Sequence, residues 1–443
     1  MKARRVGRAV AVLAAVCGAG LGNTWAAAAP QPVAWGTTVS APAGARGQLL
    51  GVAAASSSDV LAVGGFNPGQ PPTALLTKPY AERWNGTGWS ATRVPLGTVY
   101  PSGQAAQLNG VTEVAPGDGW AVGTVSDPAS FASKTLAYHW DGTAWTRRPT
   151  PNPAGPSQAN ELNAVAARSA ADVWAAGGDN YETVSLVLHW NGTAWRQVSV
   201  PDIGSLDAVT VAPGRVWVAG GDQVDQFDGT TWIKLPAPQS GLIITGLADN
   251  AAGLWAVGYV EFTCGEGQVC TSSAAALWNG TTWTAVPAGG GTALSGVVAA
   301  GSQVLAASGA GVVALSLTGA TAQITPAINP QLTAIAADPA GNPWAAGWTA
   351  TSTAVKPAII NAPGIGQGGI TVTTGAAGAT VTWVGPVTGA GGTDEGGRFA
   401  VGGLPDGSYT VTASLPGCQP GVATAAVTAG KATAVSAPIT CPP

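Results

Sequence analysis

The sequence predicts an all-β protein, and three observations lead to this fold class. The 443 residues include 64 Gly, 33 Pro and 18 Trp, and 46% are hydrophobic, which is typical of strands joined by tight turns. Only 9% of the residues are charged, where about 25% is usual in a soluble domain. Three short motifs also recur in a fixed order, which indicates a repeat architecture.

Residues 1–28 are predicted to be a signal peptide. Four cations among the first eight residues precede an apolar run from Ala9 to Leu21 and the small residues Ala26 to Ala29. Cleavage leaves 14 cations against 22 anions, so the exported chain is mildly acidic and unsuited to nucleic acid. Lipid attachment at Cys17 is the alternative, although the bulky Val16 precedes it. We therefore predict a secreted, extracellular protein that can also associate with the cell surface.

Four cysteines follow the leader, and an even number in an exported chain predicts disulfides. Cys264 and Cys270 enclose a short loop, and Cys418 and Cys441 both lie in the last segment, so we predict these two local pairs. A zinc site is the alternative, but neither of the two histidines is near a cysteine, and we expect no metal or other cofactor. The uncharged stretch from Leu294 to Ala320 fits buried strands of the repeat better than a membrane span, so none is expected after cleavage.

The repeat consists of three motifs. The first, an apolar residue, a variable one, a small one and an aliphatic one, begins at Leu49, Leu108, Leu162, Leu206, Ile244, Leu294 and Leu332. A strand of the Trp-Ala-Val-Gly type follows, beginning at Leu61, Trp120, Trp174, Trp217, Trp255, Leu305 and Trp344. The third motif is an aromatic-Asn/Asp-Gly-Thr-x-Trp hairpin, clear five times, beginning at Trp84, Trp140, Trp190, Phe227 and Trp278.

These motifs predict four antiparallel strands in each unit. Asn-Gly and Asp-Gly between apolar runs are strong hairpin signals, because a tight turn needs positive φ at its centre. Seven units at spacings of about 38 to 59 residues indicate a seven-bladed β-propeller over residues 29–360. The last unit lacks a closing strand after Trp348, so residues near 33–41 are predicted to complete blade seven. The repeated Trp residues are expected to pack between blades.

On these motifs, residues 33–360 resemble secreted propellers of the kelch and galactose-oxidase-like group. The Trp-Asn-Gly-Thr-x-Trp hairpin is similar to the Asp-box of bacterial neuraminidase-type repeats, without the Ser and Asp that precede Gly in a full Asp-box. The resemblance therefore implies the fold and no active site.

A second domain, residues 370–443, is predicted after a linker at 361–369. Alternating strand signals begin at Ile370, Ala379, Arg398, Tyr409 and Thr433, separated by Gly-rich turns. The run from Thr393 to Phe399 with that from Leu404 to Tyr409 resembles the carboxypeptidase regulatory-like, or prealbumin-like, carbohydrate-binding-like domain. The resemblance implies a small Greek-key β-sandwich and says little about a ligand.

Few residues of the sequence could carry chemistry. His139 and His189, the two histidines, both precede the Trp that opens a hairpin, where a structural role is favoured over a copper centre or a serine hydrolase. Asp59, Asp118 and Asp172 share a position before the second motif and are interpreted as caps of turn N–H groups. A pair of carboxylates is the one enzyme chemistry that this composition permits.

Loop length points to one face of the propeller. The hairpin turns are short, whereas the variable connections, such as Gly65 to Tyr80 and Val260 to Ser273, all belong to the opposite face. At their roots stand the predicted ligand-binding residues, which are Phe66, Asp179, Asp222, Tyr259 and Trp348. Aromatic faces beside carboxylates suit a sugar or an extended peptide, while the alternative is that these residues only cover the propeller.

A polar column enters the first strands, at Asn109, Asn163, Asp207, Thr245, Ser295 and Thr333. It either rings the channel mouth or satisfies neighbouring backbone groups. The favoured function is a non-catalytic, monomeric binding or scaffold protein for an extracellular polysaccharide, cell-wall polymer or protein. The alternative is a carbohydrate-active enzyme, a glycosidase or lyase, that uses carboxylates of the loop face.

Overall fold

The computed structural model contains β-strands and no helices among the residues that it describes, which confirms the all-β fold class. The described residues are 36–38, 47–67, 78–95, 104–127, 130, 132–155, 157–179, 184–239, 241–265, 268–289, 291–300, 303–309, 311–316, 319–324, 330–350, 355–361, 368–385, 388–394, 396–404, 407–427 and 432–442. The predicted leader and most of the predicted linker lie outside them. None of the described residues forms an apolar helix long enough to cross a membrane.

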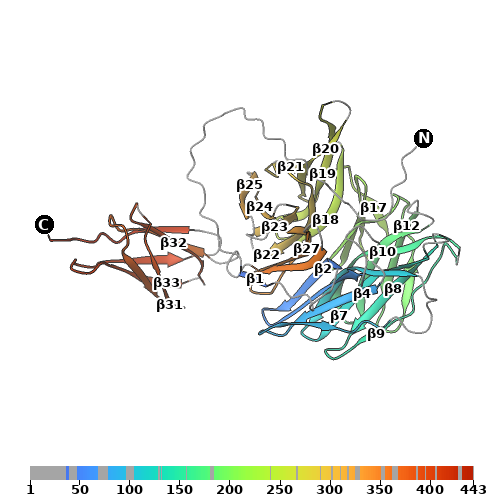
Figure 1. Cartoon of the computed structure of the whole chain (residues 1–443). Helices are drawn as coiled ribbons and strands as arrows, with labels where there is room; N and C mark the ends of the chain where they lie inside the picture. The colour runs from blue at the N-terminus through green and yellow to red at the C-terminus, as the bar shows by residue number, and fades with distance from the viewer. Residues whose placement is uncertain are drawn as a thin grey trace. The chain divides into compact units, whose positions relative to one another are not determined.

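Seven four-stranded antiparallel sheets form the blades of a β-propeller (Figure 1). Blades 1 to 4 are β2 (Gly47–Ser56), β3 (Asp59–Phe66), β4 (Lys78–Trp84), β5 (Trp89–Thr92); β6 (Ala105–Ala115), β7 (Asp118–Ser126), β8 (Ser133–Trp140), β9 (Trp145–Arg147); β10 (Asn160–Ser169), β11 (Asp172–Asp179), β12 (Val184–Trp190), β13 (Trp195–Val198); and β14 (Ala208–Ala212), β15 (Arg215–Gly220), β16 (Gln223–Phe227), β17 (Trp232–Lys234). Blades 5 to 7 are β18 (Leu242–Asn250), β19 (Gly253–Thr263), β20 (Val269–Trp278), β21 (Trp283–Val286); β22 (Leu294–Ala300), β23 (Gln303–Ser308), β24 (Gly311–Ser316), β25 (Gly319–Ile324); and β26 (Gln331–Ala337), β27 (Pro343–Ala350), β28 (Val355–Asn361) with β1 (Gly36–Thr38).

The propeller closes on itself in two ways. The first strands of successive blades contact one another from β2 through to β26, and β26 contacts β2 again. The N-terminal strand β1 pairs antiparallel with β28, with Gly36 opposite Asn361 and Thr38 opposite Ile359. The seventh sheet therefore combines the two ends of the propeller sequence, and its outermost strand comes from the N-terminal side.

Aromatic packing joins the blades. Trp120 of blade 2 lies 4.7 Å from Trp190 and 5.4 Å from Trp195, the aromatic pair of the next blade's hairpin. Trp344 of blade 7 packs in the same way on Trp84 and Trp89 of blade 1, at 5.9 and 6.0 Å. The repeated Trp residues thus supply buried area between blades, and each aromatic pair adds about 0.5–1.5 kcal/mol beyond that burial.

The polar column also joins the blades, through hydrogen bonds. In six blades the pairing of the first and second strands shifts register at the variable residue of the first motif. Such a β-bulge changes the direction in which the side chain of the variable residue points. Five of these side chains donate to a carbonyl of the next blade, namely Asn109 to Leu162 (2.8 Å), Asn163 to Leu206 (3.1 Å), Thr245 to Leu294 (2.7 Å), Ser295 to Leu332 (2.8 Å) and Thr333 to Leu49 (2.6 Å). These five residues therefore satisfy neighbouring backbone groups, as the second interpretation of the column proposed.

The five Asn/Asp-Gly hairpins share one turn geometry. Their glycines, Gly86, Gly142, Gly192, Gly229 and Gly280, have φ between 89° and 100°. In each turn the Asn or Asp side chain accepts N–H groups from the residues two and three positions later, as Asp141 does from Thr143 and Ala144 at 2.9 and 2.8 Å. A hydrogen bond from the Thr143 hydroxyl at 2.7 Å and then these N–H bonds lower the pKa of the exposed Asp141 to about 2. The hairpin motif is therefore a local turn device.

The C-terminal domain is a small sandwich of two sheets with its own core. One sheet has the order β32 (Arg398–Leu404), β29 (Gly368–Thr373), β35 (Ala432–Ser436), and the other β31 (Thr388–Gly392), β30 (Thr380–Val384), β33 (Gly407–Ser414), β34 (Gly421–Val427). Tyr409 and Val411 are buried in the core between aliphatic residues of both sheets. Two strands, β31 and β34, lie outside the segments predicted from the sequence.

Candidate functional site

The propeller has two chemically different faces. The loop face carries the connections between the second and third strands of each blade and those between blades. The hairpin face carries the remaining turns, because the strands of a blade alternate in direction. Several loop-face connections, including residues 68–77, 96–103, 180–183 and 351–354, lie outside the described residues.

The five predicted ligand-binding residues stand on five different blades. Phe66 ends β3, Asp179 ends β11, Asp222 lies in the turn between β15 and β16, and Tyr259 and Trp348 lie within β19 and β27. Tyr259 and Trp348 directly follow the glycine of the second motif, whereas Phe66 and Asp179 come one residue later. Because side chains alternate along a strand, Phe66 and Asp179 point to one side of their blades and Tyr259 and Trp348 to the other. The sequence-predicted set is thus spread around the loop face.

Phe66 belongs to a buried group within blade 1. Its ring packs edge-on against Tyr80 at 5.7 Å, and the Tyr80 hydroxyl donates to the buried carboxylate of Glu82. Burial raises the pKa of Glu82 to about 7, although the bond from Tyr80 opposes this rise. This contact gives Phe66 a packing role.

The loop end of blade 3 carries Asp179 and Glu161, and Asp202 approaches Asp179 from the connection before β14. Asp179 is 8% exposed, and its Oδ1 is buried without a hydrogen-bond partner among the described residues. Burial raises the pKa of Asp179, and the charge of Asp202 raises it further. Asp202 itself accepts the N–H groups of Ser185 and Gly204, both at 3.1 Å. Burial also raises the pKa of Glu161, which accepts a bond from the Ser133 hydroxyl.

Asp179 and Asp202 form the carboxyl pair of the described loop face. Burial and the charge of Asp202 raise the pKa of Asp179, and paired carboxyl groups with different environments can divide acid and base roles. Either carboxyl group can accept hydrogen bonds from hydroxyl and amide groups of a ligand, and a protonated carboxyl group can also donate one. Sequence reasoning found Asp179 but not Asp202, which reaches it from the connection before β14.

Among the described residues, the second and third strands of blade 5, β19 and β20, form a long hairpin on the loop face (Figure 1). The stretch from Val260 to Ser273, predicted as a variable loop, instead continues β19 to Thr263 and resumes as β20 at Val269. The prediction was wrong because polar Thr and Ser residues and a cysteine interrupt the apolar pattern, while the pairing of two strands requires only backbone groups. The Cys264–Cys270 disulfide closes the tip, and the second predicted pair, Cys418–Cys441, is also bonded.

The hairpin face contains the two histidines and the column of aspartates. Arg83 donates to Asp59 at 2.6 Å, and at the equivalent positions of the next blades His139 lies 2.8 Å from Asp118 and His189 lies 2.9 Å from Asp172. The expectation that these carboxylates cap turn N–H groups is corrected, because side chains of the third strand are their partners. The reason is cross-strand adjacency, which places a basic side chain beside each aspartate.

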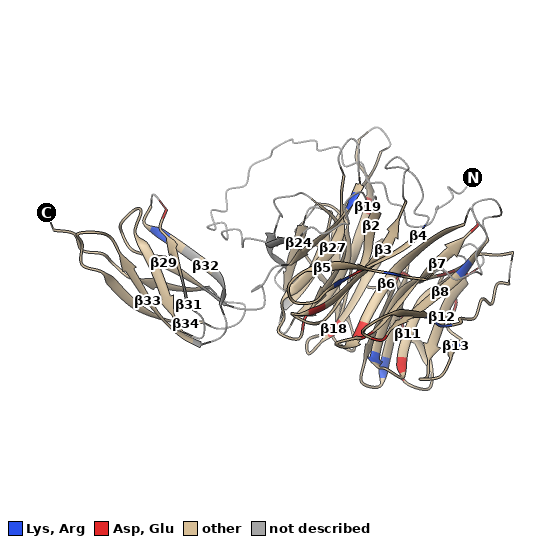
Figure 2. Cartoon of the chain, turned by 60° about the horizontal axis from the view of Figure 1, so that its bottom comes forward, with Lys and Arg blue, Asp and Glu red and all other residues tan. Residues whose placement is uncertain are grey.

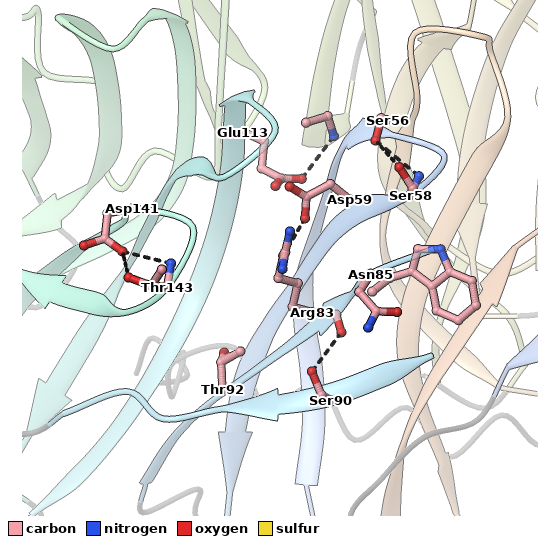
Figure 3. A network of polar contacts seen from close by, with 12 residues as sticks. Ser56, Ser58, Asp59, Arg83, Asn85, Ser90, Thr92, Glu113, Asp141 and Thr143 are labelled. Atoms are coloured by element: carbon pink, nitrogen blue, oxygen red, sulfur yellow. Dashed lines mark hydrogen bonds and ion pairs between the residues drawn. The ribbon is translucent and has the colours of Figure 1, made fainter. Parts of the chain in front are cut away.

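Between blades 1 and 2 the Arg83–Asp59 pair is joined by a second carboxyl group, that of Glu113 (Figure 3). Glu113 of β6 accepts the Ala55 N–H at 3.0 Å and lies beside Asp59 and Arg83. Burial and the charge of Asp59 raise the pKa of Glu113 to about 9, so it is neutral near pH 7. Nearby, an open groove of about 490 Å³ is lined by Arg93, Trp140 and Trp145. Asp59, Arg83 and Glu113 lie where blades 1 and 2 pack together, so we interpret them as a structural junction between the two blades.

Comparisons with known proteins found similarity to solved structures and none to family models or curated sequences. No protein-family model and no curated protein matches the chain. Among solved structures, a streptogramin B lyase is 11% identical over 74% of this chain and 97% of its own, with a TM-score of 0.48. The RRP9 WD40 repeats are 10% identical over 74% and 99% (TM-score 0.46), and a Penicillium chrysogenum alpha-L-arabinanase complexed with arabinobiose is 10% identical over 75% and 99% (TM-score 0.44).

Proposed function

We propose that the protein is a secreted, non-catalytic binding or scaffold protein. Its loop face binds an extracellular polysaccharide, cell-wall polymer or protein, and the C-terminal sandwich serves as an accessory module. The leader and the two disulfides support export.

One observation carries the proposal. The chain has two histidines, and both are held by aspartates on the hairpin face, where His139 and His189 also lie 4.8 and 4.3 Å from Trp120 and Trp174. The described loop face therefore offers rings, hydroxyls and carboxyl groups, which suit recognition of hydroxyl and amide groups. Figure 2 shows few charged residues among the strands, so attraction of a highly charged polymer is not favoured.

A second candidate is an extracellular carbohydrate-active enzyme. The raised pKa of Asp179 beside Asp202 favours it, since glycosidases use one protonated and one ionised carboxyl group. In this case Asp179 is the proton donor, and the loss of product in an Asp179→Asn variant is the expected result.

The test is a binding screen of residues 29–443 against glycans and cell-wall polymers, with release of product measured for every hit. Tyr259→Ala and Trp348→Ala are expected to weaken binding at least tenfold, because ring stacking on sugars is lost. Asp228→Asn, in a hairpin turn of the other face, is the matched control for Asp179→Asn. Binding unchanged in both aromatic variants would contradict this placement of the site, and product that depends on Asp179 would establish the enzyme instead.

A further inference from the structure

We propose that the outer edge of β20 binds an extended segment of a partner polypeptide, which adds to blade 5 as a strand. The segment has apolar residues at alternate positions and basic residues between them. This inference rests on the proposed function and specifies its protein partner.

The β19–β20 hairpin extends beyond the two strands that flank it. The pairing of β18 with β19 ends at Val260, and that of β21 with β20 covers only Ala275 to Trp278. The pairing of β19 with β20 continues to Thr263 opposite Val269. Ser273 still contacts the connection after β21, through a hydrogen bond from its hydroxyl to the Ala288 carbonyl at 3.2 Å. Among the described residues, the part of β20 from Val269 to Ser272 is paired with a strand on one side only.

The alternation of hydrogen bonds along β20 shows which of its N–H and C=O groups point away from β19. Cys264 N–H donates to the carbonyl of Gln268 at 2.9 Å, so the peptide groups of Cys270 and Ser272, in step with Gln268, face β19. Those of Val269 and Thr271 face away, on the side where β21 pairs with Ala275 farther along. This open edge can pair with a strand, as in other cases of β-augmentation.

The edge lacks the protection that sheet edges usually carry. Exposed edges are normally blocked by charge or proline, and the outer strands of blades 1 to 4 include or precede Arg93, Arg147, Arg196 and Lys234. The segment from Val269 to Ala276 has neither a charge nor a proline. The Cys264–Cys270 disulfide also closes the hairpin tip, which lowers the entropy lost when a partner strand binds.

The exposed side chains define the partner. Val269 is 68% exposed and Phe262 48% exposed, so the hairpin presents apolar groups on both of its faces. Glu261 is exposed, and the sequence has no Lys or Arg between Gly253 and Trp278. Apolar residues beside Val269 are therefore complementary to this surface, and basic residues between them are favoured because the hairpin is acidic and has no cation of its own.

The probe is an eight-residue peptide of alternating valine and lysine with blocked ends, titrated against residues 29–443 by fluorescence anisotropy. Thr271→Pro, which removes an outward N–H, and Val269→Ser are each expected to weaken binding at least tenfold. Ile233→Ser, which removes an exposed apolar residue of β17, is the matched control and is expected to leave binding unchanged. A peptide N-methylated at every residue, which has no backbone N–H to donate on either edge, is expected not to bind.

Several results would overturn the inference. These are absence of peptide binding, equal binding of the N-methylated peptide, and equal binding of a glycine–lysine peptide of the same charge. The N-methylated peptide keeps the test decisive if Thr271→Pro does not fold. A dimer abolished by Val269→Ser would assign the edge to a second copy and also refute the inference. If the polymer screen succeeds and the peptide fails, the proposed function stands without this partner.

Discussion

Replacement of Asp207 by Asn should strengthen the junction between blades 4 and 5. Five blades donate a hydrogen bond from the variable residue of the first motif to the first carbonyl of the next blade's motif. Asp207 occupies this position in blade 4, and an ionised carboxylate cannot donate to the Ile244 carbonyl. An Asn amide supplies the missing donor, as Asn163 does in the preceding blade at 3.1 Å.

The expected gain is about 1 kcal/mol in the free energy of unfolding, the net value of a typical hydrogen bond. Unfolding entropy of about 2.1 cal/mol/K per residue converts this gain to a rise of about 1.5 °C in Tm for a propeller of this length. Differential scanning calorimetry at pH 7, with urea denaturation at 25 °C as the second measurement, is suited to this difference.

Two controls separate the hydrogen bond from the loss of charge. Asp207→Leu removes the same carboxylate without adding a donor, and it should not reproduce the gain. Leu50→Asn places a donor in blade 1, where the position holds Leu, and should add to the effect of Asp207→Asn because the junctions are distant. If Asp207→Asn is no more stable than Asp207→Leu, the bond between blades does not stabilise the propeller as argued.

Three further predictions concern stability. Gly123→Ala should lower the unfolding free energy by more than about 3 kcal/mol in urea denaturation, because a Cβ would lie 2.1 Å from the Gln107 carbonyl oxygen. Gly88→Ala, where a Cβ meets nothing within 4 Å, should change it by less than about 0.5 kcal/mol, and equal effects would refute the steric argument. Trp120→Ala should cost about 3–5 kcal/mol, measured as a lower urea midpoint, and a midpoint near that of the unchanged protein would contradict packing between blades. Burial raises the pKa of Glu113 to about 9, so the folded state keeps a proton that the unfolded state releases above its ordinary pKa of 4.5. Stability should therefore fall as pH rises from about 4.5 to 9, and Glu113→Gln should flatten this slope in pH-dependent unfolding, whereas an unchanged slope would exclude Glu113 as its source.

Much of the fold followed from local signals in the sequence. The Asn/Asp-Gly turns need positive φ at their glycines, and Gly86 and Gly142 have φ of 92° and 89°. The hydrogen bonds of each turn join residues at most three positions apart, so no distant contact is required to predict the hairpin. The strands β31 and β34 were missed because their Gly- and Ala-rich segments carry weak strand propensity, and pairing with β30 and β33 decides their structure.

The candidate site was predicted less well. Asp179 was found from its place at the end of a repeated strand, but Asp202 joins it from a later connection whose path the repeat does not determine. Glu113 reaches Asp59 only because blades 1 and 2 are neighbours, with 53 residues between the two carboxyl groups in the chain. Burial then sets the protonation of both Asp179 and Glu113, and burial is a property of the assembled blades.

By itself the sequence determined the all-β class, the seven repeats and their hairpin turns, because these depend on φ preferences and on apolar periods within a few residues. Only the tertiary structure decided that the polar column bonds across blades, that basic side chains pair with the aspartates on the hairpin face, and that the pairing of β20 with β19 extends beyond its pairing with β21. These features depend on which strands become neighbours and which end beyond their partners, and packing between blades determines both.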